Sequence, residues 1–162
     1  MVALKTFLPE EAATLALGAA LGHSLSPGLV IYLRGELGAG KTTLARGVLR
    51  ALGHTGPVRS PTYALVEVYE VSRLHLHHFD FYRFTDPREW IDAGFRDTFN
   101  GLNVSLVEWP EKAGGMLPPA DLEIDLELHG TGRNAVLTSN SIAGQKCLAL
   151  LEERCLPPPP AS

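Results

Sequence analysis

The residues with the clearest chemical meaning in this sequence form a loop suited to binding a polyphosphate. The stretch "GELGAGKTT" begins at Gly35 and directly follows the apolar run "LVIYLR". Four residues separate Gly35 from Gly40, and a lysine and a threonine come next, which is the spacing of a phosphate-binding loop. Glycines let backbone N–H groups wrap around a polyphosphate, Lys41 would reach its β- and γ-phosphates, and the Thr42 hydroxyl would bind Mg²⁺. The sequence therefore predicts a nucleoside triphosphate as the ligand.

A strand must lead into such a loop, and a helix must leave it. The β-branched run from Leu29 to Leu33 predicts a buried strand, and "TTLARGVLRAL", from Thr42 onward, has apolar residues at near-helical spacing. The positive end of the helix dipole then faces the loop and favours an anion there. A glycine turn that binds nothing is the alternative, and the order of strand, loop and helix argues against it.

Two acidic residues stand where predicted strands end, and each is a candidate to serve a metal ion or a water molecule. Asp80 follows "LHLHHF", and Glu108 follows "NVSLV". Because carboxylates are hard oxygen ligands, either residue could bind Mg²⁺ directly or through water. Each acid could instead cap a helix or pair with an arginine such as Arg83, and the sequence leaves both readings open.

Strand alternation separates the histidines of "LHLHHFDFY". It sends His78 and Asp80 to one face of the strand, and His77 and Phe79 to the other. A zinc site built from His75, His77 and His78 is therefore disfavoured, and no cysteine lies near them in sequence.

The remaining patterns predict an α/β sandwich with a partly antiparallel sheet. Further strands are expected at 5–8 and within "TYALVEVYEV", "LHLHHFDFY", "NVSLVEW", "DLEIDLELH" and "NAVLTS". A hairpin is expected around Ser72 and Arg73, and "NAVLTS" is expected to pair with "DLEIDLELH". Further helices are expected from Pro9 to about His23, from Asp86 to Gly94 and over "SIAGQKCLALLEERC".

Length and composition point to one ordinary globular domain. We expect residues 1–156 to form a single domain and the proline-rich residues 157–162 to trail as a disordered tail. No apolar run is long enough to span a bilayer, so no membrane contact is expected. Because Cys147 and Cys155 have no metal-binding spacing, we expect them to stay reduced in a cytoplasmic protein.

The charge balance bears on possible nucleic-acid binding. The formal net charge of −4 argues against a protein whose main task is to grip a nucleic-acid backbone. A local basic patch is a separate possibility, and its candidate residues are Arg46, Arg50, Arg59 and Arg83.

Five stretches together resemble a known family. They are "GELGAGKTTLARGVLRALG", "VRSPTYALVEVY", "HHFDFYRF", "DPREWIDAGFRD" and "LVEWPEKAGGMLP", and they span Gly35 to Pro118, about half of the chain. In this order they are similar to the TsaE (YjeE) family, bacterial P-loop ATPases of tRNA threonylcarbamoyladenosine biosynthesis. The "SPTY" and "VEWP" stretches are more specific to that family than the phosphate loop is. One departure is "REWI", where relatives commonly have an acidic and apolar helix such as "EELE".

The resemblance implies a fold, an activity and partners. The implied fold is a three-layer, P-loop NTPase-like α/β sandwich with a mixed sheet. The implied activity is slow hydrolysis of ATP with Mg²⁺, in support of a complex of the TsaB and TsaD proteins. In that family TsaD transfers a threonylcarbamoyl group to adenosine 37 of tRNA, so contact with tRNA itself is expected to be indirect or weak.

The resemblance also assigns site residues by position. Around the phosphates it places Gly38, Ala39, Gly40, Lys41, Thr42 and Thr43. Thr42 and Glu108 would lie near Mg²⁺ while Asp80 orients or activates the water, and the roles of the two acids could be reversed. Thr62, in "SPTY", would respond to the γ-phosphate. The residues that the resemblance places at the adenine end are Glu11, Glu111 and Arg133.

Two other functional classes share a phosphate loop. A small-molecule kinase of this size needs an acceptor site and usually an arginine-rich lid, and the second half of the sequence contains no arginine-dense segment. A GTP-dependent switch needs a guanine-reading N-K-x-D pattern, which the sequence lacks. The kinase is therefore the main alternative to the ATPase.

Overall fold

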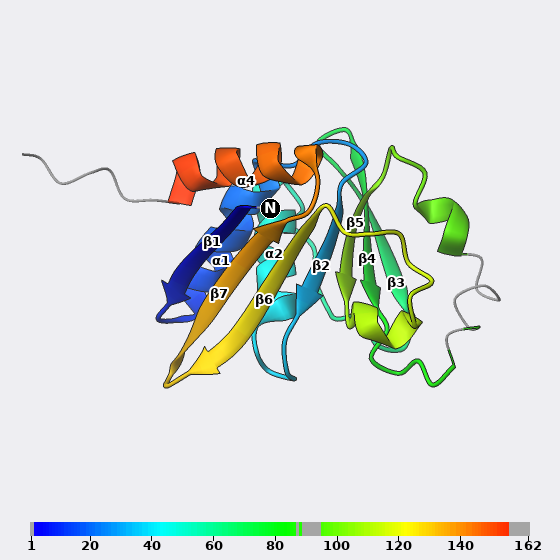
Figure 1. Cartoon of the computed structure of the whole chain (residues 1–162), viewed down its shortest axis with the longest axis horizontal. Helices are drawn as coiled ribbons and strands as arrows, with labels where there is room; N and C mark the ends of the chain where they lie inside the picture. The colour runs from blue at the N-terminus through cyan, green and yellow to red at the C-terminus, as the bar shows by residue number, and fades with distance from the viewer. Residues whose placement is uncertain (1, 87, 89–94, 156–162) are drawn as a thin grey trace, which may run out of the picture.

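The computed structural model describes residues 2–86, 88 and 95–155, which Figure 1 shows as one mixed sheet with helices packed against it. The strands are β1 (Val2–Leu8), β2 (Val30–Arg34), β3 (Val66–Val71), β4 (Leu74–Asp80), β5 (Val104–Glu108), β6 (Leu122–His129) and β7 (Gly132–Ser139). The helices are α1 (Glu11–Gly22), α2 (Lys41–Ala51) and α4 (Ile142–Cys155), with the short 3-10 helices η1 (Phe95–Thr98) and η2 (Pro110–Ala113).

Most of the elements that the sequence predicts are confirmed, with ends that differ by a few residues. The predicted helix from Asp86 to Gly94 falls largely outside the described residues, and the predicted tail at 157–162 lies wholly outside them. Within the described ranges, none of the helices combines the length and apolar composition that crossing a membrane requires.

The sheet is parallel at its centre and antiparallel at its margins. The strand order among the described residues is β1-β7-β6-β2-β5-β4-β3. Strands β6, β2, β5 and β4 run parallel, whereas β7 and β1 on one side and β3 on the other pair antiparallel with their neighbours. The predicted α/β sandwich with a partly antiparallel sheet is therefore confirmed, and so is the predicted pairing of β6 with β7.

The predicted hairpin between β3 and β4 is also confirmed. Its two turn residues, Ser72 and Arg73, both have positive φ, at 44° and 66°. A two-residue turn with this backbone matches the twist of the strands that it joins.

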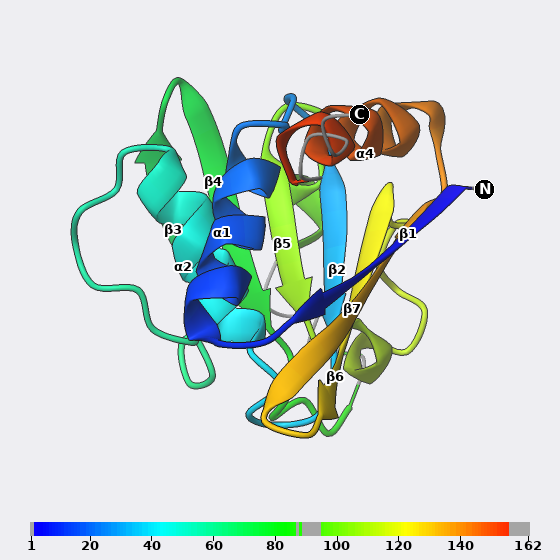
Figure 2. The same cartoon turned by 90° about the vertical axis from the view of Figure 1, so that its left-hand side faces the viewer.

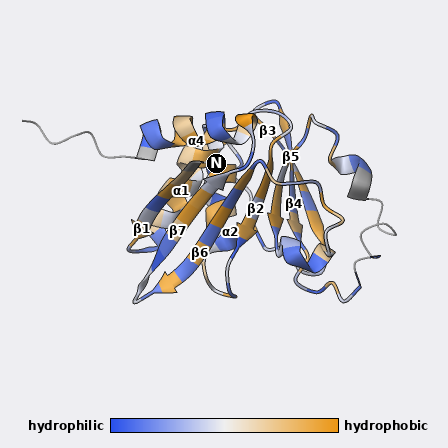
Figure 3. Cartoon of the chain, viewed as in Figure 1, coloured by the Kyte–Doolittle hydropathy of each residue, from blue (hydrophilic) through white to orange (hydrophobic). Residues whose placement is uncertain are grey.

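Apolar clusters lie on both faces of the sheet. On one face Leu33 and Leu106 pack with the helices α1, α2 and α4, and Figure 2 shows α1 and α2 alongside each other there. On the other face Phe79 and Val107 pack beneath the loops that carry η1 and η2. Because both faces are covered, β2 and β5 are apolar and almost entirely buried, whereas Figure 3 shows the more hydrophilic colouring of β6.

Helices α1 and α2 touch backbone to backbone where two glycines meet. A β-carbon on Gly18 would lie 2.3 Å from the Leu44 carbonyl oxygen, and one on Gly47 would lie 2.4 Å from that of Leu15. No side chain fits at either position unless the helices separate. Since α2 begins directly after the phosphate loop, this contact helps to set where the loop stands relative to α1.

Replacement of Gly47 by alanine should destabilise the fold. Gly47→Ala gains helix propensity but inserts a methyl group against the Leu15 carbonyl, so we expect a net loss of about 1–3 kcal/mol in the free energy of unfolding, as for overpacked cores. Urea denaturation measures this change. Arg50→Ala, at an exposed position of the same helix, is the control and should stay within about 0.5 kcal/mol of the parent. A Gly47→Ala variant as stable as the parent would contradict the close approach.

Candidate functional site

The carboxyl ends of the central parallel strands meet at one edge of the sheet, and the loop from Gly35 to Gly40 lies there. Strand β2 leads into the loop, and α2 leaves it at Lys41. Gly40 precedes the helix with φ 106°, a left-handed backbone that residues with a β-carbon rarely adopt. Helix α2 therefore points its amino end, with its unpaired N–H groups, at the space beyond the strand ends.

A pocket of about 320 Å³ occupies this space. Among the residues that the sequence places in the site, the pocket is lined by Glu11, Gly38, Gly40, Lys41, Thr42, Thr43, Thr62, Asp80, Glu108 and Arg133. Two others lie elsewhere. Ala39, within the loop, is buried and does not line the pocket, and Glu111 lines a neighbouring cavity of about 560 Å³ with Arg34 and Asp125. The structure thus separates Glu111 from Glu11 and Arg133, although the resemblance groups all three at the adenine end.

Lys41 is bound to its own loop. Its Nζ donates to the carbonyl oxygens of Gly35 at 2.5 Å and of Glu36 at 3.1 Å, and it lies 4.6 Å from the centre of the Trp109 ring. Burial lowers the pKa of Lys41, while the negative charges of Glu108 and Asp80 oppose that shift. An anion in the pocket would offer this ammonium an opposite charge, which adds a Coulombic attraction that neutral carbonyls lack.

The two candidate acids stand side by side. In the parallel pairing of β4 with β5, Asp80 is the register partner of Glu108, and each side chain is only 3% exposed. Oε2 of Glu108 lies 2.6 Å from Nε2 of His78 and accepts from the Thr42 hydroxyl at 3.4 Å. A hydroxyl and a carboxylate in contact at the start of α2 are the oxygen donors that Mg²⁺ takes beside phosphates, so this donor set fits that ion.

Asp80 is held by a different set of donors. Its Oδ2 accepts from the hydroxyls of Ser60 and Thr62, the latter at 3.1 Å, and its Oδ1 accepts from the Tyr82 N–H at 2.9 Å. Arg83, offered by the sequence as an ion-pair partner, lies instead over the ring of Tyr63, with its guanidinium carbon 4.2 Å from the ring centre. Asp80 therefore tethers the loop that carries Ser60 and Thr62 to the end of β4.

Arg133 and Glu11 reach the pocket from elements that are distant in sequence. Arg133, on β7, donates to the carbonyl oxygens of Ala39 at 3.0 Å and Gly38 at 3.1 Å. Glu11, at the start of α1, lies 3.6 Å from Arg46 of α2. Strand β7 thus holds the phosphate loop through Arg133. Arg46 is paired with Glu11, which lines the pocket.

The three histidines of β4 diverge. His75 lies 3.7 Å from Glu70, His77 stacks on Phe79 on the opposite face of the sheet, and His78 contacts Glu108.

Three residues that face the site are not among those that the sequence assigns to it. Sequence spacing offers His78 only as a zinc ligand, although strand alternation does place it on the face of Asp80. Ser60 begins the "SPTY" stretch that marks the family, but its loop has no periodicity that would direct its side chain toward Asp80. Thr14 of α1 also lines the pocket, and its buried hydroxyl makes no hydrogen bond within the described residues.

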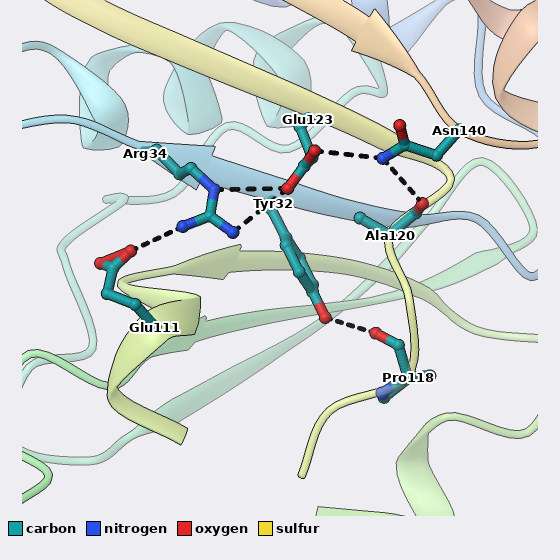
Figure 4. A network of polar contacts seen from close by, with 7 residues as sticks. All are labelled: Tyr32, Arg34, Glu111, Pro118, Ala120, Glu123 and Asn140. Atoms are coloured by element: carbon teal, nitrogen blue, oxygen red, sulfur yellow. Dashed lines mark hydrogen bonds and ion pairs between the residues drawn. The ribbon is translucent and has the colours of Figure 1, made fainter. Parts of the chain in front are cut away.

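A polar network supports the corner that follows Glu108, where Trp109 has a left-handed backbone with φ 57°. Figure 4 shows Arg34 of β2 bridging Glu111 of η2, at 2.9 Å, and Glu123 of β6, at 3.1 Å. In the same figure the Tyr32 hydroxyl donates to the Pro118 carbonyl. The segment after β5 is therefore tied to β2 at both of its ends.

Comparison with known proteins identifies the family. The family model described as "Threonylcarbamoyl adenosine biosynthesis protein TsaE" matches residues 8–135. The chain belongs to the TsaE family. The matched range contains the phosphate loop, both candidate acids and Arg133, so the whole site lies within the TsaE match.

TsaE proteins of two bacteria are similar to most of the chain. The tRNA threonylcarbamoyladenosine biosynthesis protein TsaE of Haemophilus influenzae is 39% identical over 154 residues, which cover 92% of this chain and 98% of that protein. The protein of the same name from Bacillus subtilis is 40% identical over 126 residues, covering 78% and 77%. The crystal structure of YdiB from Bacillus subtilis matches with a TM-score of 0.81 at 28% identity, covering 94% of this chain and 95% of that chain. The fold implied by the TsaE resemblance is thereby confirmed.

Because Tyr32 is buried in this network, the free energy of unfolding should fall as the pH rises above about 10. Burial raises the pKa of Tyr32 from 10.0 to about 12 in the folded protein. Below pH 10 we expect Tyr32→Phe to be less stable than the parent by about 0.5–1.5 kcal/mol, because the Pro118 carbonyl loses its donor.

The sign of the pH effect follows from this shift. As pH rises from about 10 toward 12, the phenol ionises in the unfolded chain but stays neutral in the folded one, so the parent loses stability that the variant does not lose. Urea denaturation at pH 8 and at increasing pH above 10 should therefore show the difference between the two proteins shrinking. A difference that stays constant over this range would contradict the raised pKa.

Proposed function

We propose that the protein binds ATP with Mg²⁺ and hydrolyses it in support of a TsaB–TsaD complex, during formation of threonylcarbamoyladenosine in tRNA. One observation carries the proposal: a single pocket brings together a lysine ammonium, a hydroxyl in contact with one carboxylate, and a second carboxylate. Phosphoryl transfer to water needs these parts, since its catalysis consists mainly of positioning and charge stabilisation.

Lys41 and the loop would bind the phosphates. The ammonium of Lys41 would leave the carbonyls of Gly35 and Glu36 for the β- and γ-phosphates, while the N–H groups at the start of α2 face the same charge. Arg133 would keep its bonds to the loop carbonyls and hold the loop in place.

Thr42 and Glu108 would hold Mg²⁺, and Asp80 would act on the water. When bound, Mg²⁺ neutralises charge on the phosphates. The contact between Thr42 and Glu108 supports giving Glu108 the metal, because the described hydrogen bonds of Asp80 go to Ser60, Thr62 and Tyr82 instead. Asp80 would orient the attacking water, and Thr62, bound to Asp80, would respond to the γ-phosphate.

The partner assignment rests on the family. The relatives are named for tRNA threonylcarbamoyladenosine biosynthesis, so we place ATP turnover by this chain in the same modification. The net charge of −4 favours contact with partner proteins over direct contact with tRNA.

Removal of the Lys41 ammonium should weaken ATP binding. Lys41→Ala deletes the cation that the phosphates would contact, and loss of hydrogen bonds to a charged group should weaken affinity by about 10- to 100-fold. Isothermal titration calorimetry measures this affinity. Lys112→Ala removes an exposed lysine and should bind ATP as the parent does. Equal affinities for parent and Lys41→Ala would rule out the phosphate-loop assignment.

Loss of either acid should slow hydrolysis more than it weakens binding. We expect Asp80→Asn and Glu108→Gln to keep measurable ATP affinity while kcat falls by about 10²-fold or more, because the first variant loses a group that positions the water and the second a ligand of Mg²⁺. The measurement is steady-state ATP hydrolysis, alone and with the TsaB and TsaD proteins of the same organism, which should stimulate it. Glu70→Gln, at an exposed position of β3, is the matched control and should behave like the parent.

Two outcomes would contradict the proposal. Hydrolysis at the parent rate by both acid variants would make the acids structural. Turnover that ignores TsaB and TsaD but rises with a small metabolite would instead favour the kinase.

A further inference from the structure

The side chain of His78 is completely buried beside a site acid. Its exposed fraction is 0%, and its Nε2 lies 2.6 Å from Oε2 of Glu108. An imidazole and a carboxylate are both costly to bury without hydrogen-bond partners. This contact supplies a partner to each of them, and a short bond to an ionised acceptor is a strong one.

The surroundings of the ring indicate which nitrogen carries the proton. Nδ1 of His78 is buried and has no hydrogen-bond partner within the described residues. An ionised Glu108 carboxylate can only accept, so Nε2 must donate to it. A proton on Nδ1 in place of Nε2 would leave that buried donor unpaired and would also deprive Glu108 of its donor, and both losses cost free energy in a buried site. The arrangement therefore fits a His78 ring that carries a proton on Nε2 and donates from it to Glu108.

We propose that His78 is a positioning residue for Glu108. The inference rests on the proposed function, in which Glu108 is a ligand of Mg²⁺. Both side-chain hydrogen bonds that Glu108 makes within the described part of the chain, from His78 and from Thr42, end on Oε2. The N–H of His78 thus fixes one carboxylate oxygen against rotation and leaves Oε1 for the metal shell.

The position of His78 in the sheet supports this role over simple packing. Leu76 and Leu106, its near neighbours on the same face, belong to the apolar core, where a leucine would fill the space of an imidazole without a polar cost. His77, one residue earlier, stacks on an aromatic ring on the other face and does not reach Glu108. Outer-shell partners of this kind typically matter 10- to 100-fold for metal affinity or activity.

Two substitutions separate the hydrogen bond from packing. His78→Gln and His78→Met introduce side chains of similar length and volume, but only glutamine can donate from an amide nitrogen. The measurement is the affinity for a non-hydrolysable ATP analogue by calorimetry, once with Mg²⁺ and once with EDTA. Thermal denaturation of each variant reports folding, and His77→Met is the control on the opposite face.

With Mg²⁺ we expect His78→Met to bind the analogue about tenfold more weakly than the parent, and His78→Gln and His77→Met to stay within about threefold. With EDTA all four proteins should bind within about threefold of one another. Equal Mg²⁺-dependent affinities for the glutamine and methionine variants would overturn the inference. A loss in the methionine variant that is the same with and without Mg²⁺ would also overturn it, since that is the signature of a structural role.

If the His78→Met variant does not fold, one further measurement on the parent protein still tests the inference. Nitrogen-15 NMR of the parent should show a proton on Nε2 of His78, and a ring that lacks this proton would overturn the inference. A parent whose affinity gains nothing from Mg²⁺ would overturn both this inference and the metal role of Glu108. A parent that gains from Mg²⁺, with equal glutamine and methionine variants, would overturn this inference alone.

Discussion

The site depends on the parallel pairing of β2, β5 and β4. Parallel strands bring their carboxyl ends to one edge of a sheet, and the register pairs Asp80 directly with Glu108. A slip of one residue would turn one of these acids to the opposite face of the sheet. The same edge receives the phosphate loop, because β2 lies next to β5 and ends in that loop. Strand pairing therefore decides whether the lysine and the acids share one pocket.

Bringing these groups together places several charges in a poorly hydrated space. Lys41, Asp80 and Glu108 are each 5% exposed or less, so each needs a partner. The loop carbonyls serve Lys41, two hydroxyls and an N–H serve Asp80, and His78 and Thr42 serve Glu108. These partners keep the charges compatible with folding. A ligand that binds Lys41 must therefore replace the hydrogen bonds that Lys41 already makes to the loop carbonyls.

Much of the fold and part of the site were predictable because they rest on local patterns. The phosphate loop is a contiguous stretch, and Asp80 and Glu108 each end a stretch with the composition of a strand, "LHLHHF" and "NVSLV". Alternation of side chains along β4 was enough to separate His77 from His78. The grouping of Glu111 with Glu11 and Arg133 had no such support, and the structure puts Glu111 in a different cavity with Arg34.

By itself, the sequence determined the loop, its flanking strand and helix, and the acids at the strand ends, because spacing of a few residues specifies each of them. Only the tertiary structure decided which distant groups contact one another in the site. Arg133 lies 94 residues from the Ala39 carbonyl that it binds, Ser60 lies 20 residues from Asp80, and His78 lies 30 residues from Glu108. Such contacts follow from strand order and helix packing, which depend on burial of apolar side chains over the whole sheet. The local sequence around each of these residues therefore has no pattern that predicts its partner.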